Sequence, residues 1–361
     1  MTTAPVHAFS DLDPVSLPRG RARDALWLGA AVIILALSLL AGLFIGDVSV
    51  PPQDIVLDVF SRIPLLHIHS PMSAVDSAIV WQIRLPRVVL AALVGGTLAL
   101  CGAAYQGIFR NPLAYPYLLG VAAGAGLGAT IAIVEVVNLT VLGVHALPLF
   151  AFCGALIAVG LAYGIGRSVG AGRSSTTLVL GGVAVAAFLT AIQTFLQQRH
   201  TDQLAVIYNW ILGSVATVGW SSVLTMLPYA LLAMAAILVH GRLLDVMGLG
   251  DDAARTLGVR TGQVRLVVIV AVTIGTAAAV AVSGLIGFVG LIVPHFVRLL
   301  GIRSHRMLLP LSLMLGAAFL VLCDLVARTV VSPSELPIGV VTAIVGAPAF
   351  AVVLRTSRVR G

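Results

Sequence analysis

The chain has 361 residues, of which 59% are hydrophobic and only 10% are charged. Apolar runs of about 18 residues or more recur along it, which excludes an ordinary soluble domain and predicts a polytopic membrane protein. The formal net charge of +7 comes entirely from arginine, since the chain contains no lysine. These arginines lie between apolar runs, so we attribute the positive charge to the orientation of the chain in the membrane and expect no nucleic-acid partner.

The apolar runs predict an all-α fold with two parts, a polar tail over residues 1–23 and a transmembrane domain over residues 24–361. About ten helices are expected to span the membrane, the eighth of them shortened, whereas Leu204–Leu212 is too short to cross. The predicted spans are Leu26–Ile45, Arg84–Tyr105, Pro116–Val134, Leu147–Gly166, Thr177–Leu196, Val223–Val239, Arg265–Val282, Ser283–Arg298, Leu308–Val326 and Leu336–Leu354.

Arginine placement orients these ten spans. The side that holds both chain ends carries Arg19, Arg21, Arg23, Arg110, Arg167, Arg173, Arg242, Arg255, Arg260, Arg265, Arg298, Arg303, Arg306, Arg355, Arg358 and Arg360. The other side carries Arg62, Arg84, Arg87, Arg199 and Arg328. Because cytoplasmic loops are enriched in basic residues, this split of 16 to 5 predicts that both termini are cytoplasmic.

The stretch from Arg84 to Gly128 carries the most specific pattern. It reads LPR, then G-x-x-L-x-x-x-G, then Q-G-x-x-x-NPLA-x-P-x-x-LG, so that small residues fill two apolar segments joined by a polar turn. Small residues let helix backbones approach closely in lipid, which predicts two tightly packed spanning helices. The pattern resembles the FecCD family of ABC-importer permeases, although Tyr115 stands where that family usually has an acidic residue.

The resemblance implies a type II ABC importer permease in a bacterial plasma (inner) membrane. Two copies of the chain would enclose a central pathway, with two ATPase subunits and an external substrate-binding protein as partners. The cargo would be a ferric siderophore or haem, with cobalamin as the alternative. The chain itself would hold no cofactor or metal, since ATP and Mg²⁺ would bind to the ATPase.

Energy must come from such a partner, because a phosphate-binding loop needs a lysine and the chain has none. The segment Asp245–Val259 resembles the family's coupling helix and lies on the arginine-rich side. Its two aspartates suit a helix N-terminus, its small apolar residues predict a contact face, and its glycine is expected to end the helix. The predicted ATPase-coupling residues are Asp251, Asp252, Ala253, Ala254, Arg255, Leu257 and Gly258.

Three arginines stand close to membrane ends on the side that is poor in arginine. Arg84, Arg87 and Arg328 match family arginines that pair with glutamates of the binding protein. Exposed arginines also suit carboxylate recognition and electrostatic steering, so we expect them to dock that partner, with lipid-headgroup anchoring as the alternative.

Two further sets of residues are predicted by resemblance alone. The turn Asn111, Pro112 and Leu113 matches the translocation path, while Ser175 and Thr176 match the cytoplasmic gate, for which helix N-capping is the alternative. A proton-coupled secondary transporter is the rival from another class, since it needs ionisable residues within the spans. Only Asp324 and His295 qualify: the i+4 spacing of Asp324 to Arg328 favours an intrahelical ion pair, and His295 is expected to be a packed, hydrogen-bonded side chain.

Overall fold

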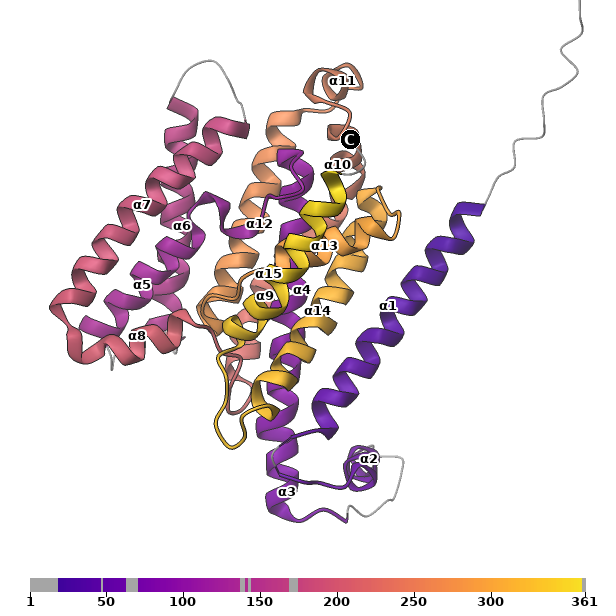
Figure 1. The fold of residues 1–361 in the computed structure, drawn as a ribbon, viewed down its shortest axis with the longest axis vertical. Coiled ribbons are helices and arrows are strands. Elements are labelled where there is room, and N and C mark those ends of the chain that lie inside the picture. Colours follow the sequence, from indigo (N-terminus) through magenta and orange to yellow (C-terminus); the bar gives the residue numbers. More distant parts are fainter. Residues whose placement is uncertain are drawn as a thin grey trace, which may run out of the picture.

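The structure is a computed structural model that describes residues 19–46, 48–62, 71–136, 140–141, 144–168 and 175–358. Within these ranges the fold is helical apart from a two-residue antiparallel ladder, in which β1 (Thr140–Val141) pairs with β2 (Val144–His145). Figure 1 shows a bundle of long, roughly parallel helices, with α1 set at its edge.

Ten apolar helices correspond to the ten predicted spans. Seven are long and apolar enough to cross a membrane, and the three shorter ones, α5, α13 and α15, fall at the third, eighth and tenth predicted spans. The ten are α1 (Arg19–Phe44), α4 (Leu85–Phe109), α5 (Val121–Glu135), α6 (Ala146–Ser168), α7 (Ser175–Arg199), α9 (Ser221–Val239), α12 (Thr261–Ser283), α13 (Val289–Leu299), α14 (His305–Thr329) and α15 (Ile338–Arg358).

Short helices connect the spans at both ends of the bundle. They are α2 (Pro52–Ser61), α3 (Ala74–Ala78), the π-helical turn η1 (Ile79–Arg84), η2 (Pro116–Leu119), η3 (Thr201–Gln203), α8 (Leu204–Ile211), α10 (Gly241–Met247) and α11 (Asp251–Thr256). We call the end that carries α10 and α11 the α11 face, and the opposite end, with α2 and α3, the α2 face (Figure 1).

The second span begins earlier than the sequence predicts. The sequence predicts that the span begins at Arg84, but α3, η1 and α4 form one continuous helix over Ala74–Phe109. Trp81 and Arg84 look like a boundary in the sequence, yet the helix runs through them because Trp81 donates a hydrogen bond to Asp58 of α2 and Arg84 is buried. Arg84 and Arg87 therefore lie inside a helix and not at its exposed start.

Glycines set how closely the helices approach α4. A Cβ added at Gly95 would lie 2.5 Å from Cβ of Leu320 in α14, and one added at Gly102 would collide with the carbonyl of Gly290 in α13. Only glycine allows such backbone contact, which is the packing that small residues permit in lipid. As a result α4 is almost completely buried at the centre of the bundle.

Candidate functional site

A buried cluster of charged side chains lies at the α2 face. Arg87, in α4, places its guanidinium between two carboxylates: Nη2 is 2.9 Å from Oδ1 of Asp324 in α14, and Nη1 is 2.6 Å from Oε1 of Glu335 in the α14–α15 loop. The predicted pair within α14 is confirmed, since Nε of Arg328 is 3.6 Å from Oδ2 of Asp324. Held between two arginines, Asp324 is poorly suited to carry a proton through the membrane.

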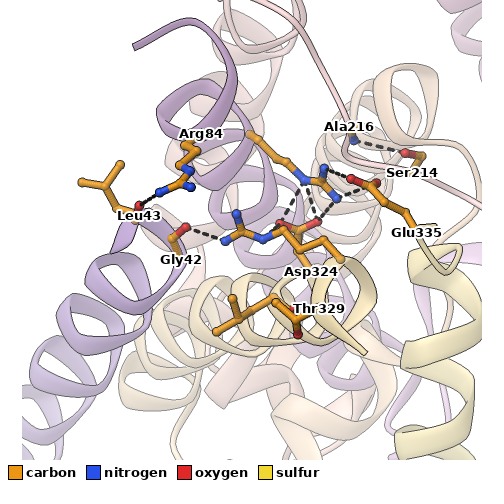
Figure 2. Close-up of polar contacts among 11 residues, drawn as sticks. Gly42, Leu43, Arg84, Ser214, Ala216, Asp324, Thr329 and Glu335 are labelled. Carbon is orange, nitrogen blue, oxygen red and sulfur yellow. Dashed lines mark hydrogen bonds and ion pairs between the residues drawn. The ribbon is translucent and has the colours of Figure 1, made fainter. Parts of the chain in front are cut away.

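The other members of this cluster bind the end of α1. Arg84 donates hydrogen bonds to two carbonyl oxygens, that of Leu43 at 3.4 Å (Figure 2) and that of Val48. Arg328 donates a hydrogen bond to the carbonyl oxygen of Gly42. A helix leaves its last four carbonyls without partners, so these guanidiniums act as C-terminal caps that join α1 to α4 and α14.

The expected exposure of the three arginines is therefore wrong. Arg84, Arg87 and Arg328 are only 4%, 8% and 4% exposed, because the cluster and the end of α1 enclose them. Sequence reasoning missed Glu335 and the α1 carbonyls, which lie far away in the chain. Contact of these arginines with a binding protein stays a prediction, and it would require this cluster to open.

At the opposite end, one carboxylate fixes α11 to the bundle. Asp251 is the first residue of α11, as predicted, and its Oδ2 lies 3.0 Å from Nη2 of Arg265 in α12. Its Oδ1 lies 3.3 Å from Nη2 of Arg110, which follows α4. Arg110 has φ of +48° at the position where helices often end in glycine, and its N–H caps α4 by binding the carbonyl of Gln106.

A second carboxylate fixes α10. Asp245 accepts hydrogen bonds from Oγ of Ser304 at 2.6 Å and from the backbone N–H of His305, and its Oδ1 lies 2.9 Å from Nδ1 of His305. Partial burial raises the pKa of Asp245, but the hydrogen bonds from Ser304 and His305 outweigh burial and lower the pKa below its ordinary value. The α10–α11 segment is thus joined to α4, α12 and α14.

The outward side of this segment is apolar. Leu249 precedes α11 and Leu257 follows it, and they are 69% and 63% exposed; Ala253, within the helix, is exposed too. Ala254 does not join this contact face as predicted, because it is fully buried against the bundle. Gly258 ends the helix with φ of +81°, as expected. Sequence reasoning missed Leu249, which lies in the turn before the helix.

Two of the remaining exposed side chains of α11 are charged. Asp252 and Arg255 form an i,i+3 pair with 3.6 Å between Oδ1 and Nη1. An exposed pair of this kind contributes little to stability, so these two groups are available to a partner.

The predicted path and gate residues lie in two separate elements. Asn111, Pro112 and Leu113 form an exposed turn beyond α4, in which Oδ1 of Asn111 accepts the N–H of Leu113 at 2.9 Å. Ser175 is the first residue of α7, and Thr176 is exposed. His67 and His69, two residues apart in a loop for which the sequence favours solvation over metal binding, lie outside the described residues. No group of three or more metal-binding side chains occurs in the described part.

The fold and this site define a class of protein. The described part of the chain is a bundle of helices that are long and apolar enough to span a membrane, with a short, anchored helix at one end, and this defines a polytopic membrane protein. More particularly, the chain belongs to the FecCD transport family, whose model matches residues 34–356.

Relatives and one solved structure agree with this assignment. The uncharacterised ABC transporter permease YvrB of Bacillus subtilis is 47% identical over 276 residues, 76% of this chain and 78% of YvrB. The cobalamin import permease BtuC of Halobacterium salinarum is 36% identical, covering 94% of this chain and 98% of its own length. The iron(3+)-hydroxamate import permease FhuB of Bacillus subtilis is 38% identical, covering 91% and 84%.

The structural match is to a metal-chelate type ABC transporter in an inward-facing conformation. Its TM-score is 0.79 at 30% identity, and the match covers 92% of this chain and 99% of that chain. The similarity extends over nearly the whole bundle, so it includes both the α2 face and the α11 face.

Proposed function

We propose that this protein is the permease subunit of a binding-protein-dependent ABC importer that brings an iron chelate into the cytoplasm. Two copies would form the pathway in the bacterial inner membrane, with both termini and the α11 face in the cytoplasm. Two separate ATPase subunits would bind ATP and Mg²⁺ and drive transport, and an external protein would deliver the cargo.

The observation that carries this proposal is the anchored α11 segment. Asp251 and Asp245 tie it to three spanning helices, so a displacement of α11 would move the ends of those helices. Its exposed Leu249, Ala253 and Leu257 offer an apolar surface for an ATPase subunit, as the sequence predicts for Asp251–Gly258.

The coupling role is tested by charging that surface. We expect Leu257→Arg to express normally yet fail to co-purify with its ATPase subunit, because an arginine would be buried unpaired, at a cost of about 3–5 kcal/mol. Val218→Arg is the matched control, since Val218 is 78% exposed in the α8–α9 loop. Normal co-purification and transport by Leu257→Arg would reject α11 as the coupling element.

The cargo needs its own experiment, because the relatives include both iron-hydroxamate and cobalamin permeases at similar identity. Iron chelate is the first candidate because the matched solved structure is described as metal-chelate type. Proteoliposomes with the complete complex should take up a ⁵⁵Fe-labelled hydroxamate siderophore or haem when ATP is supplied. Uptake of labelled cobalamin alone would replace the iron assignment.

A further inference from the structure

A basic cavity opens at the α11 face, away from the cluster of arginines described above. Its volume is about 550 Å³, and it lies between the last turns of α6, the beginning of α7 and the beginning of α12. Four arginines line it: Arg167, Arg255, Arg260 and Arg265. Its lining includes Arg255 and Gly258 of the predicted coupling segment and Arg265 of the α11 anchor, but no member of the charged cluster at the α2 face and none of the predicted path and gate residues.

Two of the four arginines carry uncompensated charge. Arg265 is bound to Asp251, and Arg255 pairs with Asp252. Arg167 and Arg260 are exposed, and in the described part of the chain neither has a carboxylate within 4.0 Å. The cavity therefore holds about two net positive charges and several guanidinium donors, which suit the oxygens of a phosphate group.

The walls of the cavity are apolar on the side of the bundle. Leu178 and Leu266 line it, and Tyr163 adds a ring with a hydroxyl group. Exposed apolar side chains continue from the cavity along one face of α12, at Leu266 and Val270, which are 41% and 47% exposed.

We propose that this cavity binds a phosphate group, and that the phosphate is the headgroup of an anionic phospholipid. The charged rim lies at helix ends, where headgroups are found, and the exposed apolar side chains of α12 give an acyl chain a surface to follow. Basic pockets between spanning helices on the cytoplasmic side are typical of such headgroup sites. This proposal is independent of the transported cargo.

Lipid binding to the full-length, delipidated permease in neutral detergent provides the test. Fluorescent phosphatidylglycerol is titrated against wild type, the double variant Arg167→Gln/Arg260→Gln and the control Arg303→Gln/Arg306→Gln. The control removes two exposed arginines at the same face outside the cavity. We expect a loss of roughly 10- to 30-fold in affinity for the cavity variant, a change below about twofold for the control, and much weaker binding of phosphatidylcholine to wild type.

Three results would overturn the proposal. Unchanged binding by a cavity variant that elutes as wild type, or an equal loss by the control, would show that the cavity does not hold the lipid. Displacement of the lipid by inorganic phosphate at low millimolar concentration would keep the phosphate site but reject the lipid as its source. Loss of lipid binding when the ATPase subunit is added would assign the cavity to the ATPase interface.

Discussion

Arg87 binds two carboxylates at similar distances, but we do not expect the two ion pairs to contribute equally to the stability of the protein. The contact to Glu335 is the shorter, at 2.6 Å against 2.9 Å for Asp324. Distance alone would make Glu335 the stronger partner. Burial reverses the order, because the side chain of Asp324 is 2% exposed and that of Glu335 is 39% exposed.

Asparagine at position 324 would leave Arg87 and Arg328 buried with no carboxylate between them. Breaking a buried pair in this way costs about 3–5 kcal/mol. Glutamine at position 335 removes a half-exposed partner that water can replace, at a cost of about 1 kcal/mol or less. We therefore expect Asp324→Asn to destabilise the protein several times more than Glu335→Gln.

The measurement is the thermal midpoint of the purified permease in detergent, followed as the fraction that stays monodisperse. Asp252→Asn serves as the control, because the side chain of Asp252 is 100% exposed and no shift is expected. Equal shifts for Asp324→Asn and Glu335→Gln, or a larger shift for Glu335→Gln, would refute the argument that burial decides the strength of these pairs.

Three further predictions concern packing, pH and docking. Gly124→Ala would force a Cβ into the backbone of α6 and is expected to destabilise the protein by about 1–3 kcal/mol, whereas Gly160→Ala meets nothing within 4 Å and leaves the thermal midpoint unchanged or raised. The pKa of Asp245 is lowered, so its carboxylate stabilises the folded protein at pH values above the ordinary pKa near 3.8, and this stabilisation is lost as the pH falls below that value. The thermal midpoint of wild type should therefore fall more between about pH 6 and about pH 3 than that of Asp245→Asn. Arg84→Glu with Arg328→Glu should lower the thermal midpoint without any binding protein present, because both side chains cap α1; if stability is unchanged and only association with the binding protein slows, the arginines act as exposed docking residues after all.

Hydropathy was sufficient to find the ten helices, because each needs a run of apolar residues and the runs are separated by polar turns. It failed at the start of the second span, where Trp81 and Arg84 interrupt the apolar pattern. Trp81 donates to a carboxylate oxygen of Asp58 at 2.6 Å, and Arg84 is covered by α1. These partners lie 23 and 41 residues away, so no local pattern could have placed the helix boundary.

The two faces differ in how far the sequence could predict them. At the α11 face the helix start at Asp251 and its end at Gly258 follow from local rules for helix termini, and both are confirmed. The partners of Asp251 could not be foreseen, because Arg110 and Arg265 come from other helices. At the α2 face the arginines were identified by resemblance, but their burial depends on the end of α1 and, for Arg87, on Asp324 and Glu335, which no local pattern marked.

The caps on α1 have a consequence for how the protein is made. Only 17% of the residues in the 18-residue apolar core of α1 are buried, and α1 packs mainly on α14. The bond from Arg328 to Gly42 joins residues 286 positions apart, so α1 enters the membrane long before its main partner has been synthesised. During that interval α1 can be covered only by α4 and η1, by lipid or by a helper protein. Its docking is thus among the last tertiary events of biogenesis, and a ribosome stalled before residue 305 would leave α1 without its α14 partner.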